Sequence, residues 1–300
     1  MYFSWSVPKK GYTWVKIHPD ATEKSEGLFL VEKYGEPKRR IYSPLEDEPE
    51  LFSRFAKLEP TSTKAILKFA NKYGNLTKGN LIVPDSHNKI EKPINIEPFK
   101  LWCNEISEFA LTYRIWRCLE EQRFEDLGLY IRWDKIDGTD VFYVISPFSN
   151  SRYLTANNPQ SEAIFNTFTQ NDLIAPAKFF LQTILSRKLK GGISLMPLED
   201  SSWNLYPYIM PDNLLRALWL QMYLAVTGEK TFIQCEWCGY LLEVTEKTRI
   251  TRKYHDNCRM AMWRQKKNVV NLSEQGKTID EIAAETKLPR EKVAEWLEEN

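Results

Sequence analysis

Cys235, Cys238, His255 and Cys258 form two pairs of metal-ligating residues, with two residues inside each pair and sixteen between the pairs. Thiolate sulfur and imidazole nitrogen are the ligands of structural zinc sites, which are tetrahedral. Two intervening residues allow a tight turn to present both side chains to one ion. The pattern therefore predicts a structural Zn²⁺ site in which protein side chains fill all four coordination positions.

Two questions about this pattern stay open at the level of sequence. A C-x-x-C pair can form a redox-active disulfide, although no strand–helix–strand pattern surrounds Cys235 and Cys238. The fourth ligand is a separate question, because Asp256 directly follows His255 and also offers a ligand atom. We expect zinc rather than a disulfide, and His255 rather than Asp256.

Basic residues concentrate within and around the predicted zinc site. The segment 247–267 holds eight basic residues and one acidic residue, whereas the whole chain has a net charge of +1. Seven of the basic residues are predicted to contact nucleic-acid phosphates: Arg249, Arg252, Lys253, Arg259, Arg264, Lys266 and Lys267. Such contacts give an affinity that is sensitive to salt and depends little on base sequence.

The elements that must position these residues indicate a chain of the α+β class in three parts. The first part, residues 1–228, is predicted to be an α+β body without a recognisable specificity. It contains a long amphipathic helix over 99–123 and a second strong helix over 211–226. Residues 80–97 are expected to form an exposed loop, and Asp137-Gly138 is expected to form a hairpin turn.

The second part, residues 229–268, is predicted to be a treble-clef zinc finger. A turn carries the first ligand pair, a strand follows, and His255 and Cys258 begin a helix. So small a unit has little core, and metal binding would supply much of its folding energy. Met260 and Trp263 are expected to pack against the zinc site.

The third part, residues 269–300, resembles the helix-turn-helix of many bacterial regulators. Thr278 and Glu281 have the spacing of a capping box at the start of a helix. Lys287 occupies the turn position where this motif usually has glycine. The last predicted helix carries four acidic residues that oppose a phosphate backbone, which are Glu291, Glu295, Glu298 and Glu299.

A wider resemblance rests on three stretches, which are Leu214-Leu-Arg-Ala-Leu-Trp-Leu-Gln-Met-Tyr, Cys235-x-x-Cys238-Gly and Arg252-Lys-Tyr-His255-x-x-Cys258-Arg-Met. Together they resemble a set of uncharacterised bacterial proteins with a C-terminal treble-clef zinc finger. Those proteins usually have cysteine at the position of His255, and both residues are zinc ligands. The region is also distantly similar to the zinc fingers of stress-induced transcription regulators, without their Cys-Gly-Asn-Arg signature. The resemblance implies an architecture more than an activity.

Composition and missing motifs narrow the function classes. No apolar run approaches the ~20 residues of a membrane span, and the N-terminal stretch lacks the order of a signal peptide, so we expect a cytoplasmic protein. Three scattered histidines and the lack of a phosphate-binding glycine loop or nucleophile motif disfavour an enzyme. We expect a zinc-containing bacterial regulator that binds DNA or RNA. The alternative is a protein-interaction or assembly module in which zinc is purely structural.

Overall fold

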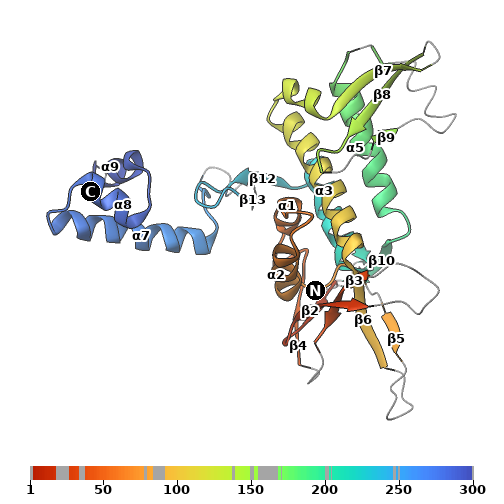
Figure 1. Cartoon of the computed structure of the whole chain (residues 1–300), viewed down its shortest axis with the longest axis horizontal. Coiled ribbons are helices and arrows are strands. Elements are labelled where there is room, and N and C mark those ends of the chain that lie inside the picture. The colour runs from red at the N-terminus through yellow and green to blue at the C-terminus, as the bar shows by residue number, and fades with distance from the viewer. Residues whose placement is uncertain are drawn as a thin grey trace. The chain divides into compact units, whose positions relative to one another are not determined.

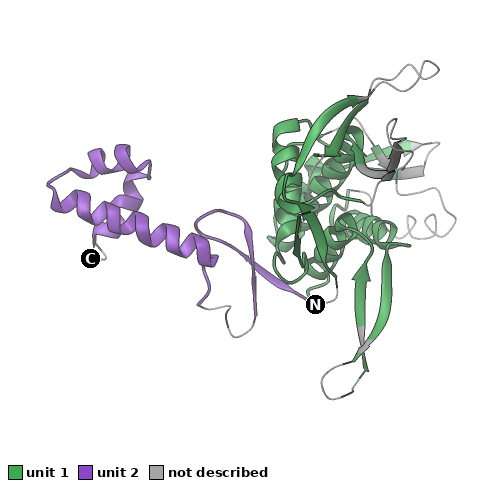
Figure 2. Ribbon diagram, turned by 90° about the horizontal axis from the view of Figure 1, so that it is seen from below, with its two compact units in different colours: residues 1–229 green, residues 230–300 purple. Residues whose placement is uncertain are grey.

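The computed structural model describes residues 3–17, 27–33, 38–77, 80–83, 92–136, 139–148, 152–154, 168–169, 171–199, 203, 205–245, 248 and 251–298. The chain divides into two compact units, residues 1–229 and 230–300, which are coloured separately in Figure 2. Both units combine helices with small antiparallel sheets, so the predicted α+β class is confirmed. None of the helices in these ranges has both the length and the apolar character that a membrane crossing requires.

Unit 1 is built around a group of helices, of which Figure 1 labels α1, α2, α3 and α5. They are α1 (Leu51–Ala56), α2 (Thr63–Tyr73), α3 (Phe99–Glu120), α5 (Ile174–Leu189) and α6 (Leu214–Val226), with a short 3₁₀ helix, η1 (Phe124–Leu129). α3 packs against α1 and α5, and α6 packs against the same two helices. The two long helices predicted from the sequence are therefore α3 and α6.

Aromatic residues from these helices form the core of unit 1. Trp102, Phe109 and Trp219 are fully buried. The ring centroids of Phe109 and Trp219 lie 4.4 Å apart, and those of Phe55 and Phe109 lie 5.2 Å apart in an edge-to-face arrangement. Aromatic pairs at such spacings add about 0.5–1.5 kcal/mol each beyond their burial. The high aromatic content of the sequence therefore reflects a packed core in the body.

One buried carboxylate ties a loop of unit 1 to this core. Glu97 accepts hydrogen bonds from the Leu76 backbone N–H and the Trp102 indole N–H, both at 3.0 Å, and from the backbone and hydroxyl groups of Thr77. Burial raises the pKa of Glu97, and the donors act in the opposite direction. Because every lone pair that faces the interior has a donor, Glu97 has a structural role.

Unit 1 also contains small sheets, all antiparallel. One has the strand order β2 (Tyr12–Ile17), β3 (Gly27–Glu32), β6 (Lys92–Pro98) and β5 (Asn80–Val83). A second consists of β7 (Ile131–Ile136), β8 (Thr139–Ile145) and β9 (Arg152–Leu154). Two strand pairs complete the set: β1 (Trp5–Pro8) with β4 (Arg39–Tyr42), and β10 (Ile193–Glu199) with β11 (Leu205–Pro211). The predicted hairpin turn at Asp137-Gly138 lies outside the described residues.

The loop predicted over residues 80–97 is wrong at 80–83 and 92–97, which form β5 and most of β6 with Leu81 paired to Ile94, and its middle part lies outside the described residues. The sequence Leu81-Ile82-Val83 and the alternation of Ile94 and Ile96 are typical of strands. These apolar residues outweigh the prolines of β6, which lack a backbone donor and usually disfavour a strand interior.

Unit 2 begins with a hairpin of β12 (Thr231–Gln234) and β13 (Leu241–Val244) and continues with α7 (Asp256–Glu274), α8 (Ile279–Thr286) and α9 (Arg290–Glu298). The three helices enclose a small core of five buried residues, which are Val269, Leu272, Ile282, Val293 and Trp296. Trp237, in the turn after β12, stacks on Trp296 with ring centroids 6.3 Å apart. So small a core leaves the hairpin in need of another source of stability.

The ends of α8 follow from local signals. The Glu281 backbone N–H donates to the Thr278 hydroxyl and the Glu281 carboxylate accepts from the Thr278 backbone N–H, so the predicted capping box is confirmed. At the other end Lys287 has a φ of 57°, in the left-handed region that favours glycine. A non-glycine residue adopts this conformation at a cost of about 1 kcal/mol.

Candidate metal centre

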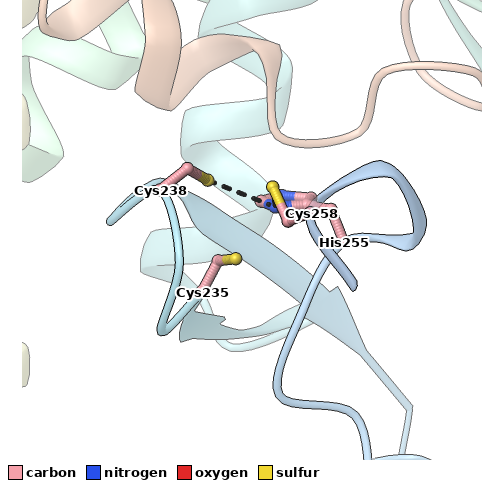
Figure 3. A group of neighbouring side chains, drawn as sticks. All are labelled: Cys235, Cys238, His255 and Cys258. Atoms are coloured by element: carbon pink, nitrogen blue, oxygen red, sulfur yellow. Dashed lines mark hydrogen bonds between the residues drawn. The ribbon is translucent and has the colours of Figure 1, made fainter. Parts of the chain in front are cut away.

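The first ligand pair lies in a tight turn after β12. The Cys235 backbone N–H donates to the Tyr240 carbonyl at 2.8 Å, and the Gly239 N–H donates to the Cys235 carbonyl at 2.9 Å. Gly239 has a φ of 67°, a conformation that glycine adopts without strain. The Cys-x-x-Cys-Gly stretch therefore folds back on itself, and the Cys235 and Cys238 thiols both point toward the second pair (Figure 3).

The second ligand pair begins α7. His255 is the N-cap residue, with an extended backbone, and Cys258 lies in the first helical turn. The Glu236 N–H donates to the Lys253 carbonyl at 3.2 Å, which holds the segment before His255 against the turn of the first pair. Both spacings seen in the sequence thus have a local cause, a tight turn for one pair and a helix start for the other.

The four ligand atoms converge on one point. The three cysteine sulfurs and one ring nitrogen of His255 all lie within 4.8 Å of one another (Figure 3). His255 Nδ1 lies 3.4 Å from Cys238 Sγ and 3.8 Å from Cys258 Sγ. Zn–S bonds of about 2.3 Å and Zn–N bonds of about 2.0 Å in a tetrahedron separate the ligand atoms by roughly 3.5–3.8 Å. The cluster is therefore compatible in size with a bound metal ion.

A backbone carbonyl selects one tautomer of the neutral histidine. His255 Nε2 lies 3.0 Å from the Leu241 carbonyl oxygen. A carbonyl only accepts hydrogen bonds, so this contact requires a proton on Nε2, and in that neutral tautomer the lone pair of Nδ1 faces the sulfurs. Metal-ligating histidines generally donate their second nitrogen to such an acceptor. Leu241 was not foreseen from the sequence, and nothing in the sequence could reveal it, because any residue supplies a carbonyl.

The electrostatics of the thiols also fit a cation. Burial raises the pKa of Cys235, but hydrogen bonds from the backbone N–H groups of Cys238, His255 and Trp237 lower it to about 6. Burial and the neighbouring Cys238 and Cys235 sulfurs raise the pKa of Cys258 to about 12. Three thiolates this close repel one another, and a divalent cation removes that repulsion. The donor set therefore suits a metal ion that binds thiolates.

The geometry of the site bears on both questions left open by the sequence. All five cysteines are free thiols, so Cys235 and Cys238 form no disulfide. The Asp256 side chain is 79% exposed and lies 3.9 Å from Arg259, whereas the ring of His255 belongs to the cluster. Within the described residues this is the only group of three or more His, Cys, Asp or Glu side chains placed to hold a metal ion.

The basic residues before α7 differ in their surroundings. Arg249 lies outside the described residues. Arg252 donates to the Glu243 carbonyl at 3.1 Å, which links it to β13. Lys253 is exposed, with its ammonium 3.7 Å from the Glu236 carboxylate. These contacts stabilise the hairpin and leave Lys253 as the more accessible cation of this segment.

The other basic residues lie on one helix. Four of them belong to α7, which are Arg259, Arg264, Lys266 and Lys267. The same helix has no acidic residue between 257 and 273. Arg264 and Lys267 are exposed, and neither has a carboxylate partner within the described part of the chain. α7 therefore presents a concentrated positive charge directly beside the cluster.

Met260 and Trp263 do not pack against the cluster, contrary to expectation. Met260 is 48% exposed and Trp263 is 56% exposed. At 3.6 residues per turn both side chains project away from Cys258, Val269 and Leu272, which face the metal site and the helical core. Counting residues around the helix from Cys258 would have placed Trp263 on the outer face.

Replacement of His255 tests which atom completes the cluster. We expect His255→Cys to keep one metal ion per chain, because thiolate is an equally good ligand, and His255→Ala to lose it. The measurement is metal content after gel filtration, supported by the thiolate-to-cobalt absorption of the Co²⁺-substituted proteins. Asp256→Ala is the matched control and should retain the metal; loss of metal from Asp256→Ala and not from His255→Ala would assign the fourth position to the carboxylate.

Comparison with known proteins adds no family or fold relative. The chain matches no protein-family model, no curated protein and no solved structure. We therefore infer the function from the residues and the geometry of the site.

Proposed function

We propose that the cluster holds a structural Zn²⁺ ion in a treble-clef zinc finger that binds nucleic acid, and that the protein is a bacterial regulator. Cys235, Cys238, His255 and Cys258 fill all four positions of a tetrahedral shell, which leaves none open for a substrate. The turn, the hairpin and a helix that starts at the second ligand pair are the parts of a treble clef. Zinc would fix the start of α7 relative to the hairpin and so orient the whole helix.

The nucleic-acid proposal is supported mainly by the difference between the two faces of α7. One face is anchored, with Cys258 in the metal cluster and Val269 in the helical core. The other face carries exposed Arg264 and Lys267, and α7 has no acidic residue between 257 and 273. Phosphate backbones are bound by such arrays of Arg and Lys, because their neutralisation releases counterions. We assign phosphate contact to this outer face.

The remaining helices of unit 2 are proposed to support this face. α8 and α9 are the helices of the proposed helix-turn-helix-like tail, and α9 carries exposed Glu291, Glu295 and Glu298. Arg290 lies 3.2 Å from Asp280, and Lys292 lies 2.9 Å from Glu295. Because its cations are paired and its acids are exposed, α9 is a poor candidate for reading bases in a groove.

The acidic surface of α9 favours one alternative, a protein-interaction or assembly module in which zinc is purely structural. In that case α9 would contact a basic surface of a partner, and the α7 cations would be solvated. Binding of fluorescein-labelled DNA and RNA oligomers by the zinc-loaded protein, followed by anisotropy at two salt concentrations, separates the two functions. Nucleic-acid binding requires affinity at low salt that falls as salt rises; its absence favours the assembly module.

A further inference from the structure

The outer face of α7 has an aromatic ring at the centre of its cations. Trp263 is 56% exposed, one helical turn from Arg259 and one turn from Lys267. The Lys267 ammonium lies 5.6 Å from the centroid of the Trp263 ring. Arg259, Trp263 and Lys267 therefore follow one another along one side of the helix at intervals of about 6 Å.

An exposed indole in this position has little structural purpose. The core of unit 2 is formed by residues on the opposite side of α7, and Trp263 is not among them. The backbone below the ring is nevertheless fixed, because Cys258 belongs to the metal cluster and Val269 is fully buried. The ring is thus a large apolar surface held in place and offered to solvent.

Nucleobases are the ligand class that matches an aromatic surface flanked by cations. A base stacks on an indole through its face, and the adjacent phosphates meet the Arg and Lys side chains. A base in a duplex has both faces covered by its neighbours, whereas a base in a single strand has them available.

We propose that Trp263 is a stacking platform for an unpaired base, and that the α7 face binds single-stranded nucleic acid in preference to duplex. This inference rests on the proposed nucleic-acid function and specifies its ligand. Arg259, Arg264 and Lys267 contact the phosphates on either side of the stacked base. Affinity for the strand then has two sources, a salt-dependent one from the cations and a salt-independent one from the ring.

Replacement of Trp263 separates these two sources. The probes are a single-stranded DNA oligomer of about 16 nucleotides and the duplex that it forms with its complement, at one salt concentration. We expect Trp263→Ala to weaken binding of the single strand by about five- to one-hundred-fold and to leave duplex affinity unchanged. Trp263→Phe should retain more of the affinity than Trp263→Ala, because a smaller ring still stacks. Zinc content measured on each variant verifies that the site is intact.

Trp203 provides the matched control, since it is 83% exposed and lies in unit 1. Trp203→Ala should bind the single strand as the unchanged protein does. Equal losses for strand and duplex, no loss for either, or a larger loss for duplex in Trp263→Ala would overturn the stacking role. A wild-type protein that binds duplex as tightly as single strand would overturn the preference alone. A wild-type protein that binds neither at low salt would overturn the proposed function itself.

Discussion

Cys258→Ser is expected to release the metal ion and unfold the β12–β13 hairpin together with the first turn of α7, while unit 1 stays folded. Serine keeps the size of the side chain but replaces a thiolate with a hydroxyl, which is a poor zinc ligand. Structural Zn²⁺ contributes about 10–16 kcal/mol of apparent binding free energy in small zinc-finger peptides, and that energy stabilises the fold. The hairpin is joined to the helical core through Trp237, and this contact alone should not hold it.

The result is measured by zinc content and by hydrogen–deuterium exchange of peptides from both units. Residues 230–258 should lose protection, and peptides from α3 and α6 should keep it. Cys103→Ser is the matched control, because Cys103 is a partly buried free thiol on α3 outside the cluster. One zinc per chain retained by Cys258→Ser, or a fully protected hairpin after zinc loss, would show that the cluster does not organise unit 2.

The double variant Arg264→Glu with Lys267→Glu is expected to lose nucleic-acid affinity by at least roughly tenfold at low salt. Both residues are exposed on the outer face of α7, so their replacement leaves the metal site and the helical core in place. Each lost phosphate contact lowers the slope of log affinity against log salt by about 0.7 for single strands and about 0.9 for duplex. The slope should therefore decrease together with the affinity.

A control with the same change in charge distinguishes a local effect from one of net charge. Lys100 and Lys178 are exposed lysines of unit 1, and Lys100 lies in the first turn of α3, where an acidic residue is favourable to the helix dipole. Lys100→Glu with Lys178→Glu should change affinity far less than the α7 double variant. Equal losses in the two double variants would mean that the protein binds through its overall charge. Unchanged affinity in both would show that the α7 face is not the binding surface.

Sequence patterns predicted the features that arise from local chemistry. The candidate metal ligands could be identified because their residue types and their spacing are both visible in the sequence. The structure brings together the ligand atoms of Cys235, Cys238, His255 and Cys258. The capping box of Thr278 and Glu281 is a local signal of the same kind. The long helix predicted over 99–123 is observed as Phe99–Glu120, since its apolar periodicity extends over many turns.

Features that depend on distant partners were harder to predict. The strands within residues 80–97 are stabilised by pairs such as Leu81 with Ile94. The polar residues and prolines of this segment favour a loop when that pairing is not known. The carbonyl of Leu241 that orients His255 belongs to a strand of no unusual composition. Trp263 is an exception, because its position along α7 relative to Cys258 already places it on the outer face of the helix. The division of the chain at 228 and 268 and the cytoplasmic location remain predictions.

We propose that zinc organises a basic face of α7 which binds nucleic acid, and a single titration distinguishes the outcomes. Fluorescence anisotropy of a labelled single strand and a labelled duplex is recorded with zinc-loaded and chelated samples of the full chain, at about 50 and 200 mM salt, with zinc content measured on the same samples. We predict affinity that falls steeply between the two salt concentrations, is lost on chelation and returns when zinc is restored. The proposal would be overturned by a lack of binding at the lower salt concentration with one zinc per chain. It would also be overturned by binding whose affinity is the same with and without zinc.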